Sequence, residues 1–107
     1  MFPDDVCFDV ELTTKTHGID ISWRLGDRCS SSQEYRNNNV YTKKCCLRPG
    51  DYVLSCDDSH GDGWQGGFIQ IQGKKYCDDL SRWSRLNKKV TIAGTFGSGI
   101  QIILNFN

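Results

Sequence analysis

The densest group of chemically capable side chains lies between Cys56 and Gly67, in the segment CDDSHGDGWQGG. It holds three carboxylates and four glycines within eleven residues of Cys56. Carboxylates this close repel one another, and glycines allow backbone carbonyl oxygens to turn toward a common point. Calcium takes roughly six to eight oxygens from carboxylates, carbonyls and water. The segment therefore predicts a calcium site, with a solvated Asp/Gly-rich turn between two strands as the simpler alternative.

A second acidic pair strengthens the calcium hypothesis. Cys56 and Cys77 each precede two aspartates. A disulfide between these cysteines would hold their Cα atoms within about 7 Å and so bring the two pairs together. The spacing is not that of an EF-hand, because no glutamate closes the loop and no helices flank it. The expected ligands are five carboxylates and a loop carbonyl, for which His60 is a candidate: Asp57, Asp58, His60, Asp62, Asp78 and Asp79.

Trp64 lies among the glycines, next to the acids. Its ring could serve as a ligand-binding platform on which a sugar stacks. Alternatively, it fills one end of the core and orders the loop, and we favour this second role.

Cysteine usage places the chain outside the cytosol. An even number of cysteines in a short chain with a small core is typical of disulfides, and no CxxC pair suggests a metal-thiolate site. Cys45 and Cys46 are adjacent, so on a strand they point to opposite faces and need different partners. Those partners are Cys7 and Cys29, in an order that the sequence leaves open. All six are expected to be bridged: Cys7, Cys29, Cys45, Cys46, Cys56 and Cys77.

Length and charge limit the number of domains and the classes of function that this chain can have. The 107 residues fit a single domain, residues 1–107, and the formal net charge is zero. A neutral chain is a poor nucleic-acid binder, and no apolar run approaches the roughly 20 residues that span a bilayer. The first five residues lack the basic start and apolar run of a signal peptide, so we expect a mature secreted chain. Enzymatic activity is not expected, because there are only two histidines and no hydrolase motif.

Hydrophobic residues alternate with polar ones through most of the chain, which is typical of strands with one solvated face. Gly, Pro and Asn turn signals separate the alternating segments. The pattern predicts an all-β fold, an antiparallel β-sandwich of jelly-roll or CUB-like type stapled by disulfides. A short helical turn over residues 79–86, with Leu80, Trp83 and Leu86 facing inward, competes with a loop. The predicted strands include residues 6–12, 19–25, 69–71, 90–92 and 100–106.

The stretch YVLSCDDSHGDGWQGGFIQIQGKKYC resembles the secreted DSYGDGWNGG type of extracellular β-sandwich module. Such modules occur in marine-invertebrate matrix proteins and some bacterial surface proteins, and are CUB-like in size and disulfide use. The resemblance covers residues 49–79 and implies a non-catalytic module with calcium at Asp57, Asp58 and Asp62. His60 and Gln65 depart from the aromatic and asparagine that the motif often has.

These observations predict a secreted, calcium-binding structural or adhesive protein, with self-assembly into an extracellular or skeletal scaffold as one version. Its partners would be further copies of itself or an extracellular glycan or matrix. A calcium-dependent lectin is the main alternative, and a small hydrolase the third. Sulfated glycans or mineral anions could bind a local basic patch formed by Arg82, Arg85, Lys88 and Lys89, with Lys74 and Lys75 nearby in sequence.

Overall fold

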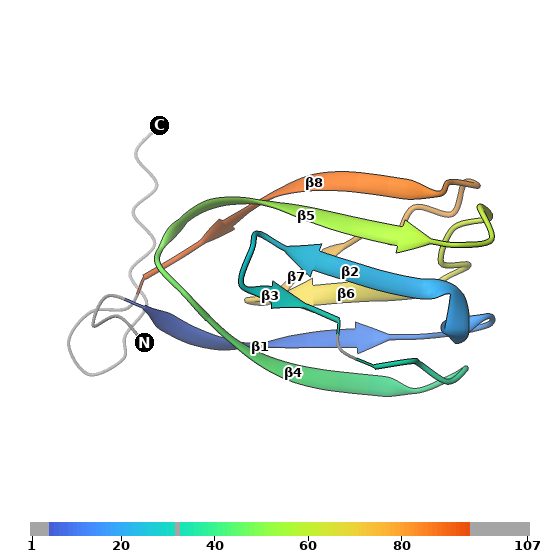
Figure 1. Cartoon of the computed structure of the whole chain (residues 1–107), viewed down its shortest axis with the longest axis horizontal. Coiled ribbons are helices and arrows are strands. Elements are labelled where there is room, and N and C mark those ends of the chain that lie inside the picture. Colours follow the sequence, from blue (N-terminus) through green and yellow to red (C-terminus); the bar gives the residue numbers. More distant parts are fainter. Residues whose placement is uncertain (1–4, 32, 95–107) are drawn as a thin grey trace.

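The computed structural model describes residues 5–31 and 33–94. Within these residues the fold is all-β, with two four-stranded antiparallel sheets in a sandwich-like arrangement (Figure 1). Sheet A has the strand order β4-β1-β6-β7, and sheet B has the order β3-β2-β5-β8. The elements are β1 (Val6–Thr13), the 3₁₀ turn η1 (Gly18–Asp20), β2 (Ile21–Leu25), β3 (Cys29–Ser30), β4 (Val40–Leu47), β5 (Gly50–Asp58), β6 (Phe68–Ile71), β7 (Lys74–Tyr76) and β8 (Arg85–Ile92).

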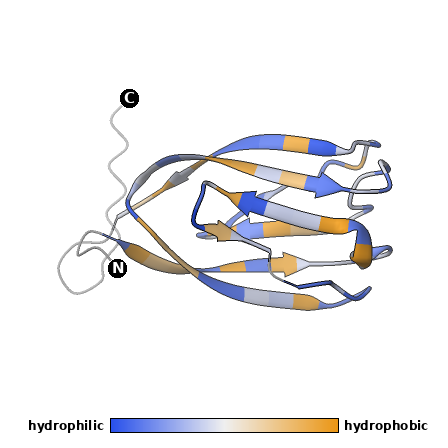
Figure 2. Cartoon of the chain, viewed as in Figure 1, coloured by the Kyte–Doolittle hydropathy of each residue, from blue (hydrophilic) through white to orange (hydrophobic). Residues whose placement is uncertain are grey.

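The period-two pattern builds the core as the sequence predicts. In β2 the side chains alternate buried and exposed along the whole strand, and β8 ends in the same way. The last five residues of β5 alternate buried with half-buried. Apolar and polar residues alternate along several strands, as the hydropathy colouring of Figure 2 shows, and the buried apolar set faces the space between the sheets. The buried core includes Val10, Leu12, Trp23, Leu25, Leu54, Trp64, Ile69, Ile71, Val90 and Ile92.

The disulfides settle the pairing that the sequence left open. Cys56 is bonded to Cys77, as predicted. Cys45 faces the core and is bonded to the buried Cys29, whereas Cys46 faces outward and is bonded to Cys7. Cys7 and Cys46 are directly opposite each other on β1 and β4 of sheet A. The other two bonds join the sheets. Cys29 on β3 and Cys56 on β5 belong to sheet B, whereas Cys45 lies on β4 of sheet A and Cys77 directly follows β7 of sheet A.

Three expectations about local structure were open, need correction or lie outside the described residues. Ile19 belongs to η1 and is 65% exposed, so the inward alternation begins only at Ile21. Of the two alternatives for residues 79–86, the structure has the loop, over residues 79–84, and β8 begins at Arg85. Trp83 is buried and Leu86 half-buried, but Leu80 is 82% exposed. The predicted strand 100–106 falls outside the described residues.

Loops that are far apart in the sequence gather at one end of the sandwich. The ends of β1, β5 and β7 lie there together with the start of β8, and the start of β1 and the end of β8 lie at the opposite end (Figure 1). The Asp/Gly-rich loop is part of this group, which is called the loop end below.

Three of the outermost strands share a sequence feature. β4, β7 and β8 each carry two consecutive lysines, at Lys43–Lys44, Lys74–Lys75 and Lys88–Lys89. Charged lysines on edge strands oppose pairing with another chain.

No helix among the described residues has the length and apolar character needed to span a membrane.

The exposure of the cysteines predicts an order of reduction. Cys7 is exposed, whereas Cys29, Cys45, Cys56 and Cys77 are at most 5% exposed. Because thiol–disulfide exchange requires access to a sulfur atom, the bond between Cys7 and Cys46 should be reduced first under native conditions. Alkylation after brief mild reduction, followed by mass spectrometry, measures this. Early labelling of Cys56 or Cys77 would contradict the arrangement.

Candidate functional site

The Asp/Gly-rich loop connects β5 to β6 and packs closely on the segment that precedes β8. The N–H of Gly63 donates to the carbonyl oxygen of Trp83 at 2.9 Å, and the N–H of Asp58 donates to that of Ser84 at 2.8 Å. A Cβ on Gly63 would lie 2.8 Å from the carbonyl oxygen of Ser81. Glycine is therefore required here for close approach of the two chain segments as well as for its positive φ of 77°.

Trp64 fills the core at the loop end. It is 1% exposed, and its ring lies 5.7 Å from the ring of Trp83 between centroids. Its indole N–H donates to the carbonyl oxygen of Asp57 at 3.0 Å. The ring face is thus covered by protein, and Trp64 orders the loop in place of offering a sugar-stacking platform.

Asp58 and Asp62 are neighbouring acids that contact each other in the loop. Asp58 is 3% exposed, and its Oδ2 accepts a hydrogen bond of 2.9 Å from the N–H of Asp62. The Oδ1 atoms of both residues are buried and have no hydrogen-bond partner. Burial raises the pKa of the Asp58 carboxyl above its usual value, and the neighbouring Asp62 carboxylate adds to the rise. Two carboxylate oxygens are thus withdrawn from water without compensation, which is costly unless a proton or cation joins them.

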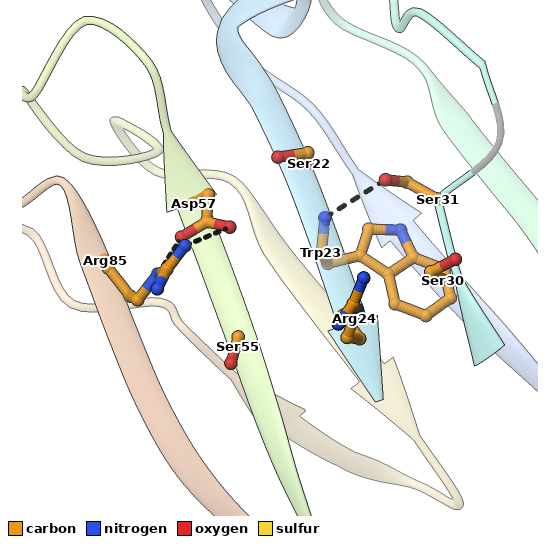
Figure 3. Close-up of a pocket in the computed structure, with 8 residues that line it drawn as sticks. All are labelled: Ser22, Trp23, Arg24, Ser30, Ser31, Ser55, Asp57 and Arg85. Atoms are coloured by element: carbon orange, nitrogen blue, oxygen red, sulfur yellow. Dashed lines mark hydrogen bonds and ion pairs between the residues drawn. The ribbon is translucent and has the colours of Figure 1, made fainter. Parts of the chain in front are cut away.

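Asp57 is directed away from this pair. Successive side chains of a strand point to opposite faces, so Asp57 lies on the outer face of sheet B while Asp58 faces inward. Arg85, opposite Asp57 on β8, holds its carboxylate through Nε at 2.5 Å and Nη2 at 3.3 Å (Figure 3). This ion pair raises the pKa of the Arg85 guanidinium further.

Asp78 and Asp79 also stand apart from Asp58. Both are exposed, and Asp79 Oδ1 lies 3.5 Å from Lys88 Nζ. The backbone turns sharply at Cys77, whose φ is 59°. The disulfide of Cys56 with Cys77 therefore forms without gathering the five acids. Across residues 5–31 and 33–94, no group of three or more His, Cys, Asp or Glu side chains is arranged to hold a metal ion.

His60 belongs to a polar network on the outside of the loop end. Its ring is stacked with that of His17 at 6.4 Å between centroids. His17 Nδ1 lies 3.2 Å from Gln65 Oε1, and Gln65 Nε2 donates to Asp62 Oδ2 at 2.5 Å. The loop is therefore tied to the segment after β1. Sequence reasoning missed His17 and Gln65 as partners, because nothing in the local sequence links positions 48 residues apart.

No protein-family model, curated protein or solved structure matches the chain. The loop end presents the buried Asp58 and the half-buried Asp62, whose Oδ1 atoms have no hydrogen-bond partner. The neighbouring glycine-rich backbone offers carbonyl oxygens close by in sequence.

The close packing of the loop predicts the effect of adding a methyl group to Gly63. Gly63→Ala places a Cβ against Ser81 and Trp83, whereas Gly73, with a φ of 81°, has nothing within 4 Å of that position. Gly73→Ala should lower the free energy of unfolding only by the conformational cost of a left-handed residue, roughly 1–2 kcal/mol. Gly63→Ala should lower the free energy of unfolding by clearly more than Gly73→Ala does, as measured by chemical denaturation. Equal losses for the two variants would contradict the packing.

The burial of Trp64 predicts a stability effect on truncation. Trp64→Ala should lower the free energy of unfolding by about 3–5 kcal/mol, because a large core side chain is replaced by a cavity. Denaturant titration followed by circular dichroism measures this change. An unchanged stability together with a lost affinity for a sugar on a glycan array would instead restore the stacking role.

Proposed function

We propose that this protein is a secreted, non-catalytic module with a structural or adhesive role, in which calcium at the loop end fixes the Asp/Gly-rich loop. One observation carries the proposal: the buried Oδ1 atoms of Asp58 and Asp62 lack any hydrogen-bond partner. An ion between them would offset both their mutual repulsion and their loss of water.

The proposal narrows the ligand set expected from the sequence. Asp58 and Asp62 would supply carboxylate oxygens, and carbonyls of the glycine-rich loop, including that of His60, together with water would complete the shell. Asp57 is occupied by Arg85, and Asp79 lies beside Lys88. Calcium is favoured over a transition metal because the donors are hard carboxylate and carbonyl oxygens.

The role of the ion would be mechanical. The loop already rests on the segment before β8 and on the segment after β1. Binding between Asp58 and Asp62 would rigidify a part of the chain that connects the two sheets, as β5 belongs to sheet B and β6 to sheet A. Three disulfides, which persist in oxidising compartments, support secretion.

The alternatives have less support. A calcium-dependent lectin would lose its aromatic platform because Trp64 is buried. A hydrolase based on the carboxylate pair would need substrate to reach Asp58, which is 3% exposed. Self-assembly remains one form of the structural role. Lys74, Lys75, Lys88 and Lys89 line one depression of about 260 Å³ together with Asp78, and they would attract the acidic loop end of another copy. Lys88 and Lys89 also pair with Asp79 and Asp51 within the chain.

The calcium site is tested by thermal melting in calcium and in EDTA. A ligand that binds only the native state stabilises it by about 2.7 kcal/mol when its free concentration is ~100 times Kd. Calcium should therefore raise the Tm of the native chain. Asp58→Asn should abolish this rise but should not lower the Tm in EDTA, because the amide oxygen still accepts from Asp62 and the repulsion is gone.

Asp57→Asn is the matched control, since it removes the same charge from the adjacent position. It should retain the calcium response. The calcium proposal would be overturned by a melt insensitive to both chelation and added calcium, or by an equal response of Asp58→Asn and the native chain.

A further inference from the structure

The outer face of sheet B carries a polar groove of about 390 Å³ (Figure 3). Its lining differs from the acidic loop, because it is mostly serine and arginine. Its walls come from β2, β3, β5 and the start of β8. Most of the lining is hydroxyl or guanidinium groups, with one carboxylate: Ser22, Trp23, Arg24, Ser30, Ser31, Ser55, Asp57 and Arg85.

The strand register explains why the groove exists. Arg24 is opposite Ser30 on β3 and opposite Ser55 on β5. Ser22, two residues earlier on β2, is opposite Asp57. Short serine side chains on three neighbouring strands thus surround a long arginine on the same face and leave a hollow beside it.

The charges of the groove leave one cation uncompensated. Asp57 is engaged on both oxygens by Arg85, so this pair contributes no net charge. Arg24 is exposed and, within the described part of the chain, makes no ion pair or side-chain hydrogen bond. Its guanidinium donors are therefore directed to solvent on the wall of a hollow.

This combination suits an oxyanion. A guanidinium presents parallel N–H donors that match the two oxygens of a sulfate ester or a carboxylate, and nearby hydroxyls can donate to the remaining oxygens. The Oγ of Ser55 donates to Asn87 Oδ1 and that of Ser31 accepts from the N–H of Trp23, whereas Ser22 and Ser30 have hydroxyls without such a partner among the described residues.

We propose that this groove binds an anionic group of an acidic polysaccharide, with Arg24 as its central contact and Ser22 and Ser30 as hydroxyl donors. The inference deepens the adhesive role proposed above by naming the partner's chemistry. It does not depend on calcium, because the groove lies on the outer face of sheet B and Asp58 faces the interior.

Binding of dextran sulfate, polygalacturonate and uncharged dextran to the full chain, measured by biolayer interferometry at moderate salt, tests the proposal. Dextran sulfate and polygalacturonate separate sulfate esters from carboxylates as the source of the oxyanion. At least one should bind, uncharged dextran should not, and EDTA should leave the affinity unchanged. A loss of binding in EDTA would tie recognition to calcium and overturn the independence of the groove.

Three variants separate the groove from general attraction to cations. Arg24→Gln should weaken binding roughly tenfold or more, as expected for losing a hydrogen-bonded charge. Arg24→Lys keeps the charge but not the planar fork, so it should restore only part of the affinity. Lys44→Gln removes the same charge from an exposed position on β4, at an edge of sheet A, and should change affinity much less.

Arg24 is exposed, so its replacement should leave the Tm unchanged, which checks that each variant is folded. Equal losses for Arg24→Gln and Lys44→Gln would show delocalised attraction and overturn the groove. Full affinity in Arg24→Lys would show that charge alone decides, and would overturn the assigned role of the guanidinium fork.

Discussion

The alternation of side chains along β5 is the constraint on which the rest of the structure depends. Leu54, Cys56 and Asp58 face the interior, and Ser55 and Asp57 face outward. The inward set closes the core, forms the inter-sheet disulfide and withdraws one carboxylate from water. The outward set forms part of the groove and the ion pair with Arg85. Two adjacent aspartates therefore have unrelated environments, because a one-residue step on a strand reverses the face.

The fold class and one disulfide could be predicted from the sequence because each rests on local information. Period-two alternation marks the strands, and the shared context of Cys56 and Cys77 identifies their bond. The adjacent Cys45 and Cys46 were expected to face opposite ways, and they do. Their partners required the strand order, which places Cys7 directly beside Cys46 in sheet A.

The candidate site was less predictable, because proximity in sequence does not give direction in space. Asp57 and Asp58 were grouped as ligands, yet the pleat separates them. Asp78 follows the bridged Cys77, yet it is exposed beyond a sharp turn of the backbone. The pairing of Asp58 with Asp62 and the contact of His17 with Gln65 follow from the three-dimensional path of two loops. Ile19 and Leu80 show the same limit, since neither apolar side chain reaches the core.

The consecutive lysines on β4, β7 and β8 affect how the protein behaves at high concentration. Unpaired strand edges invite fibril growth when many copies are crowded together, and a charge at each step makes such addition repulsive. A chain built this way can be packed densely with less risk of fibril growth through these three strands. Its contacts with neighbouring copies would then form through the sheet faces and the loop end, where side chains specific to this sequence decide what binds. Backbone hydrogen bonds at strand edges, which any extended chain could supply, would contribute less.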